Sequence, residues 1–214
     1  MTERTASEGQ TNSRSDRAFG LTWDYRCPFA RNMHEHVVAG LRAGAAWRVT
    51  FIPFSLNQVH VREGERDVWD DPKRARDLLA MQVGIAIRDG WPEHFLDAHI
   101  ALFAARHDRG MDLRDEQVLA TVLKELGLPP ETVLDKARGG EPLETFRRQH
   151  EDAVAEHSVF GVPTVILDGR AVFLRIMDRP GDHGGHARDT VDRLLDLIAG
   201  WPELNEFKYT QIPR

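Results

Sequence analysis

The chain of 214 residues contains a single cysteine, Cys27, which is the residue best suited to covalent chemistry. A β-type run from Phe19 to Trp23 leads into it, and an amphipathic helical pattern from Pro28 to about Leu41 follows. The thiol is therefore predicted at a helix start, where unpaired N–H groups and the helix dipole favour thiolate over thiol. Pro28 suits the first helical position, and we count it among the substrate-contacting residues. We predict that Cys27 is a reactive nucleophile rather than a buried structural cysteine.

Four side chains next to the sulfur are candidates for the same site. Tyr25 and Phe29 are expected to line it, with a core position as the alternative for both. Arg26 directly precedes the nucleophile and is the best local cation for lowering the thiol pKa, unless it is a solvent-facing charge. Asp24 is expected either to orient the loop, to assist proton transfer, or to be a solvated loop residue.

The histidines give weaker signals. His34 lies about two helical turns from Cys27, too far for a direct thiolate partner, so we predict that His34 and His36 are surface residues. The segment from Asp182 to His186 contains two histidines and an aspartate in a glycine-rich loop, without a cysteine. This is a weak metal signal, and we predict no metal site. A position of this loop near Cys27 is the other interpretation.

The remaining sequence predicts the elements that must position these side chains. The β-rich run from Trp47 to Phe54 predicts a second strand that ends at Pro53. A polar stretch from Asn57 to Pro72 follows it. Two apolar runs around Asp168-Gly169 predict a hairpin. Helical periodicity predicts helices at Lys73 to Asp89, Pro92 to Arg106, Asp115 to Leu126 (Asp115 as N-cap), Pro130 to Ala137, Pro142 to Ser158 and Ala187 to Ala199.

Composition limits the class of protein. With 41% hydrophobic and 29% charged residues, the chain is typical of a globular protein. No apolar run approaches the ~20 residues of a membrane span, and the polar N-terminal residues do not form a secretory signal. The net charge of −6 has acids and bases interspersed, which argues against nucleic acid as a partner. One unpaired cysteine favours a reducing compartment, so we expect a cytoplasmic protein.

The order of elements predicts an α/β core interrupted by an all-helical insertion. We place a disordered tail at 1–17, the core at 18–56 and 141–200, the helical insertion at 57–140, and a C-terminal tail at 201–214. The oligomeric state stays open, with a homodimer among the options.

Two segments carry a resemblance to a known family: the Cys-Pro-Phe-Ala sequence at 27–30 and the segment 160–169, which contains Gly-Val-Pro-Thr. Together they resemble the DsbA-like branch of the thioredoxin fold, in which a helical domain is inserted into the core. The chain also looks like the mycothiol-dependent nitroreductase and FrnE-type relatives. The resemblance implies that Pro163 is a cis-proline beside the cysteine and that Val162 recognises the substrate through its backbone.

The sequence departs from the family pattern at Ala30, where the usual Cys-X-X-Cys site has its second, resolving thiol. We therefore expect no tightly bound cofactor but a low-molecular-weight thiol, mycothiol or glutathione, as cosubstrate in monothiol exchange with a small-molecule or protein disulfide. The alternatives are a thiol transferase or isomerase related to the kappa class, in which serine generally replaces the cysteine, and a catalytically inactive binding module.

Overall fold

The computed structural model describes residues 17–209 and contains a four-stranded mixed sheet with the order β2-β1-β3-β4. β1 pairs in parallel with β2 and antiparallel with β3, and β3 pairs antiparallel with β4. Leu21 at the centre of β1 lies between Phe51 of β2 and Val165 of β3. The strands are β1 (Arg17–Trp23), β2 (Trp47–Pro53), β3 (Thr164–Leu167) and β4 (Arg170–Phe173).

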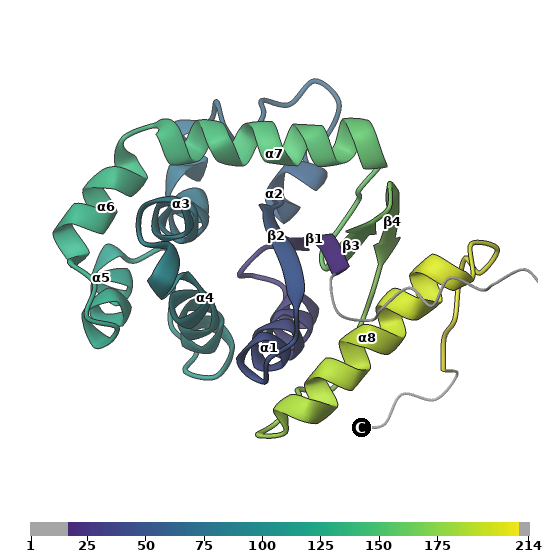
Figure 1. Cartoon of the computed structure of the whole chain (residues 1–214). Helices are drawn as coiled ribbons and strands as arrows, with labels where there is room; N and C mark the ends of the chain where they lie inside the picture. The colour runs from purple at the N-terminus through teal and green to yellow at the C-terminus, as the bar shows by residue number, and fades with distance from the viewer. Residues whose placement is uncertain (1–16, 210–214) are drawn as a thin grey trace, which may run out of the picture.

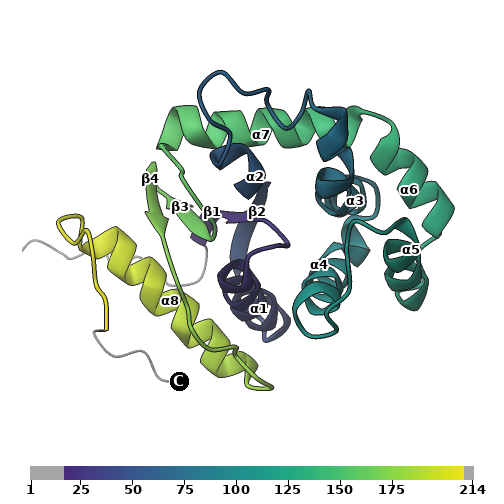
Figure 2. The same cartoon turned by 180° about the vertical axis from the view of Figure 1, so that it is seen from behind.

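The described part of the chain contains eight α-helices in addition to the sheet (Figure 1). Helix α1 and helix α8 pack side by side on one face, and the long α7 crosses the other (Figures 1 and 2). Helices α3 to α6 form a separate group beside the sheet, and α7 reaches across to them. The bounds are α1 (Pro28–Arg42), α2 (Leu56–Val59), α3 (Ala75–Gly90), α4 (Pro92–His107), α5 (Glu116–Glu125), α6 (Pro130–Arg138), α7 (Glu141–His157) and α8 (Gly184–Gly200), with a 3₁₀ turn at Pro72–Arg74.

This architecture confirms the predicted fold class, a thioredoxin-like α/β core with inserted helices. The predicted strands, helices and hairpin are all present, with ends that move by a few residues, and Asp115 caps α5 through a hydrogen bond from the Gln117 N–H. Helix α8 begins at Gly184, so part of the predicted glycine-rich loop is its first turn. The polar stretch after β2 contains the short α2 and the 3₁₀ turn.

The chain ends were predicted to be tails. β1 begins at Arg17, one residue inside the predicted N-terminal tail, and the other residues of that tail lie outside the described part. Residues 201–209 contain no helix or strand, and residues 210–214 lie outside the described part of the chain. None of the described helices is long and apolar enough to cross a bilayer.

Helix α1 is enclosed on more sides than its amphipathic pattern predicts. It packs against β1, α4 and α8, and at Gly40 a Cβ atom would lie 2.5 Å from the Trp47 ring. As a result, several polar side chains of α1 are buried and must find partners inside the protein. They are Asn32, His34, Glu35 and His36.

Candidate active site

Cys27 is the N-cap residue of α1, as the sequence predicts. Its backbone is extended (φ −93°, ψ 118°), Pro28 occupies the first turn, and the Ala30 N–H points at the sulfur with N···Sγ 3.4 Å. The thiol in turn donates a hydrogen bond to the Val162 carbonyl oxygen at 3.3 Å. Only 8% of the residue is exposed. The sulfur is thus held between the helix start and a loop 135 residues further along the chain.

That loop presents a backbone carbonyl to the sulfur. The Val162–Pro163 peptide bond is cis, and both residues are buried. Thr164 fixes the loop from both sides, because its N–H donates to Thr22 Oγ1 at 2.8 Å and its hydroxyl donates to Gly161 O at 2.8 Å. The structure therefore brings Cys27 together with Val162 and Pro163, the two residues that the family resemblance singled out.

The protonation of Cys27 differs from our expectation. Burial raises the pKa of the thiol above its ordinary value, and this effect outweighs the N–H groups of Ala30 and Phe29, which lower it. The Asp24 carboxylate raises this pKa further, and the Arg175 guanidinium lowers it. The helix start is present as predicted, but desolvation disfavours the thiolate more strongly than the N–H groups favour it. Cys27 therefore rests as a thiol that donates to Val162.

Arg26 is not the cation that acts on the sulfur. Its side chain is exposed and donates to Asn57 Oδ1 at the start of the insertion. Arg175, on the segment after β4, supplies the charge instead. Its guanidinium lies over two rings, 5.2 Å from the Phe29 centroid and 5.3 Å from that of Phe173. Sequence reasoning missed Arg175 because it lies far along the chain from Cys27 and belongs to no motif.

Asp24 and Tyr25 hold the loop that precedes the cysteine. The buried Asp24 carboxylate accepts hydrogen bonds from the backbone N–H groups of Arg26 (2.9 Å) and Leu56 (3.0 Å), so it orients the loop and ties it to α2. Its own pKa is raised, chiefly by burial. Tyr25 is also buried, and His107 donates to its carbonyl at 2.9 Å. The Tyr25 side chain therefore lies in the core and not at the site surface, whereas the half-buried Phe29 stays beside Arg175.

A buried chain of hydrogen bonds starts at the Tyr25 hydroxyl. It runs to His99 Nδ1 (3.0 Å), from His99 Nε2 to His34 Nδ1 (2.8 Å), and from His34 Nε2 to Thr22 O (3.1 Å). A carbonyl only accepts, so His34 must carry its proton on Nε2 and accept at Nδ1. The same reasoning gives His99 an Nε2 proton and makes Tyr25 the donor. Every neutral group in this chain is thereby satisfied.

Our prediction that His34 and His36 are surface residues is wrong. They are 0% and 3% exposed, because α4 and the segment after β4 cover the faces of α1 that would otherwise meet solvent. Burial lowers the pKa of His34 to about 4 and that of His99 well below its ordinary value, so both are neutral. His36 donates through Nδ1 to Asn32 O at 2.9 Å. The histidines of the segment from Asp182 to His186 form no metal-binding cluster with other described residues.

These features were compared with known proteins. A family model for the DSBA-like thioredoxin domain matches residues 22–179, which is most of the chain. This chain belongs to the DsbA-like thioredoxin family. A search of curated protein sequences found no match.

Solved DsbA-like structures share the fold. Pseudomonas aeruginosa DsbA has a TM-score of 0.55 and 18% identity over 90% of this chain and 89% of its own. Xylella fastidiosa DsbA has a TM-score of 0.55 and 18% identity over 86% of this chain and 87% of its own. A 2-hydroxychromene-2-carboxylate isomerase has a TM-score of 0.59 and 15% identity over 85% of this chain and 98% of its own. DsbA-like proteins of this architecture thus include oxidoreductases and an isomerase, and at these identities the likeness concerns the fold alone.

Proposed function

We propose that this DsbA-like protein is a thiol oxidoreductase that uses Cys27 in monothiol exchange with a low-molecular-weight thiol. The observation that carries the proposal is the contact between Cys27 Sγ and Val162 O beside cis-Pro163, together with a buried alanine where a resolving thiol would stand. Because Ala30 cannot resolve a mixed disulfide, the second thiol must come from another molecule, and the proposed donor is a small thiol of the glutathione or mycothiol kind.

The site supports a definite role for each group. In exchange, the Cys27 thiolate attacks a disulfide, and the N–H groups of Ala30 and Phe29 stabilise its charge. Once Sγ has joined the mixed disulfide, it no longer donates to Val162. The Val162 carbonyl is then free to accept an N–H from the bound substrate. We keep the cytoplasm as the proposed location, since a single unpaired thiol is best preserved there.

A second function follows from the raised pKa of Cys27. A thiol that stays protonated can donate a hydrogen bond to the thiolate of a bound small molecule and so activate that molecule. This is transferase or isomerase chemistry, in which Cys27 itself forms no disulfide.

Mass spectrometry after incubation with an oxidised small thiol distinguishes the two functions. Exchange predicts a stable adduct of one thiol on the native protein, released by excess reduced thiol, and no adduct on Cys27→Ser. Transferase chemistry predicts no adduct on either protein. It also predicts that Cys27→Ser retains transferase or isomerase activity, because a serine hydroxyl can donate the same hydrogen bond to the bound thiolate. A native protein that forms no adduct at any pH up to about 10, well above the pKa of an unperturbed thiol, would rule out the exchange proposal.

A further inference from the structure

The segment that joins β4 to α8, residues 174–183 (the strap), contains an arginine that packs on the ring of Phe29, two residues after the cysteine. Arg175 is exposed, its guanidinium lies over the rings of Phe29 and Phe173, and its charge acts on the Cys27 thiol. Stacking on aromatic faces fixes the plane of a guanidinium and leaves its N–H groups free at the edge. Within residues 17–209, Arg175 forms no ion pair with a carboxylate.

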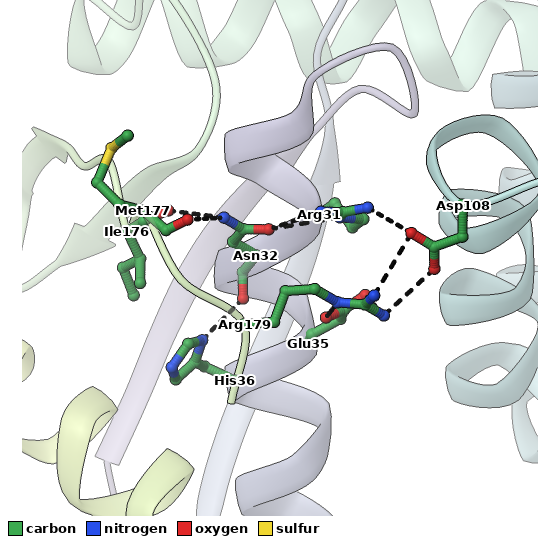
Figure 3. Close-up of polar contacts among 8 residues, drawn as sticks. All are labelled: Arg31, Asn32, Glu35, His36, Asp108, Ile176, Met177 and Arg179. Atoms are coloured by element: carbon green, nitrogen blue, oxygen red, sulfur yellow. Dashed lines mark hydrogen bonds and ion pairs between the residues drawn. The ribbon is translucent and has the colours of Figure 1, made fainter. Parts of the chain in front are cut away.

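The strap is attached to α1 directly after Arg175. Asn32 Nδ2 donates to the carbonyl oxygens of Ile176 and Met177, both at 2.9 Å. Figure 3 shows these bonds reaching from α1 to the strap. Since Cys27 is the N-cap of α1, the backbone beside Arg175 is held by the same helix that holds the sulfur.

A second attachment of the strap follows two residues later, and it pairs the neighbouring arginines with carboxylates. Arg179 donates to both oxygens of the buried Glu35, at 2.6 and 2.8 Å, and also contacts Asp108 at the end of α4 (Figure 3). Arg31 pairs with the same aspartate at 2.6 Å. Two arginines and two carboxylates thus balance each other. Arg175 stays outside this cluster, as an oriented cation that the fold itself does not neutralise.

The aromatic contacts also continue toward the Val162 loop. Phe160, which is 66% exposed, lies with its ring centroid 5.2 Å from that of Phe173. A ligand whose sulfur reaches Cys27 between this loop and the helix start therefore meets apolar rings and one guanidinium. A guanidinium edge pairs best with a planar carboxylate, through two parallel hydrogen bonds.

We propose that Arg175 binds a carboxylate of the thiol or disulfide that reacts with Cys27. The cosubstrate would then be an acidic thiol of the glutathione class and not an uncharged sugar thiol such as mycothiol. This inference rests on the proposed exchange at Cys27. With oxidised glutathione the step is balanced: the Cys27 sulfur bonds to one glutathione sulfur, the disulfide breaks, and the released thiolate takes up the proton that Cys27 gave to solvent. Cys27 is oxidised and one glutathione is reduced.

The test compares three disulfides: oxidised glutathione, oxidised glutathione esterified at its carboxylates, and the cationic disulfide cystamine. The rate of mixed-disulfide formation is followed by mass spectrometry. We expect Arg175→Ala to slow the reaction with glutathione relative to the ester roughly 3- to 10-fold, the range for one exposed to partly shielded charged contact. Taking the ratio of the two rates removes the change in thiolate fraction, which affects all probes alike. Arg175→Glu should also raise the rate with the cationic cystamine relative to that with oxidised glutathione, whose carboxylates the new carboxylate repels.

Two further variants show whether position matters. Arg148→Ala, on the exposed face of α7, makes the same change in net charge and should leave the ratio unaltered. Asn32→Ala keeps Arg175 but removes the strap's attachment beside it, and should lower the ratio by a smaller factor. Adducts with an unchanged ratio in Arg175→Ala would overturn the role of Arg175 and leave the exchange proposal intact. Absence of adducts with all three probes in the native protein would overturn both.

Discussion

At the scale of residues, Cys27 combines features that oppose each other. The N–H groups at the start of α1 and Arg175 lower its pKa, while burial and Asp24 raise it, and burial is the largest effect. The thiolate that attacks a disulfide is therefore a minor species near neutrality. This balance gives the site a pH dependence that differs from that of an activated cysteine.

We expect the rate of Cys27 alkylation by iodoacetamide to rise about tenfold per pH unit from neutrality to beyond pH ~8.5, the pKa of an unperturbed thiol. Asp24→Asn should shift the curve to lower pH, because the Asp24 carboxylate raises the thiol pKa. The urea-unfolded protein serves as the control and should level off near the unperturbed value. A plateau below about pH 7 in the folded protein, well under the unperturbed value, would contradict the dominant effect of burial.

Ala30 determines whether the chain can complete a redox cycle by itself. Its amide nitrogen lies 3.4 Å from the Cys27 sulfur and its side chain is buried in the first turn of α1. We expect Ala30→Cys to form an internal disulfide after mild oxidation, detected as the loss of two hydrogen atoms, and to release a small thiol bound at Cys27. Cys27→Ser/Ala30→Cys is the control and should do neither. If Ala30→Cys keeps its small-thiol adduct, the geometry of a dithiol site is absent.

At the scale of elements, the site depends on contacts between α1, α4 and the loop before Cys27. The chain of hydrogen bonds from Tyr25 through His99 and His34 to Thr22 joins α4, α1 and β1. Helix α3 packs against the Tyr25 hydroxyl, where this chain of hydrogen bonds starts: a Cβ at Gly84 would lie 2.4 Å from the hydroxyl oxygen. The inserted helices thus help to position the loop that precedes Cys27.

Removing the first donor of this chain should be costly. We expect Tyr25→Phe to lower the free energy of unfolding by about 1–3 kcal/mol, because His99 Nδ1 would remain buried without a donor. Tyr209→Phe, at a side chain that is 75% exposed, is the matched control and should have no measurable effect. Nitrogen NMR shifts should show both His34 and His99 protonated on Nε2 in the native protein. An Nδ1 proton on either ring would contradict this assignment of donors and acceptors.

At the scale of the whole molecule, buried neutral histidines make stability depend on pH. Burial lowers the pKa of His34 and of His150 to about 4, and it lowers that of His99 well below its ordinary value. Unfolded histidines bind protons near pH ~6.5, so between pH ~6.5 and ~4 the unfolded state binds more protons than the folded state. Stability is then lost as the pH falls through this window. Asp24 has the opposite effect on stability: its pKa is raised on folding, so its protonation at low pH favours the folded state.

We expect each fully buried histidine to contribute up to about 3 kcal/mol to this loss, which urea unfolding between about pH 7 and 4 would measure. His150→Asn should reduce the pH slope, since an amide oxygen can still accept the Ser55 N–H but does not titrate. The same substitution at the exposed His60 is the control. A slope unchanged by His150→Asn would contradict a neutral, buried His150.

The sequence by itself determined the family, the order of the elements and the place of Cys27 at a helix start, because these follow from local periodicity, turn residues and two short motifs. Tertiary structure decided the rest. Whether Tyr25, His34 and His36 were buried depended on what packs on α1, and helices and a strap from distant parts of the chain cover it. Arg175 became the cation that acts on the sulfur through the same packing. The pKa of Cys27 likewise depended on desolvation, which is a property of the assembled core and not of the residues next to the cysteine.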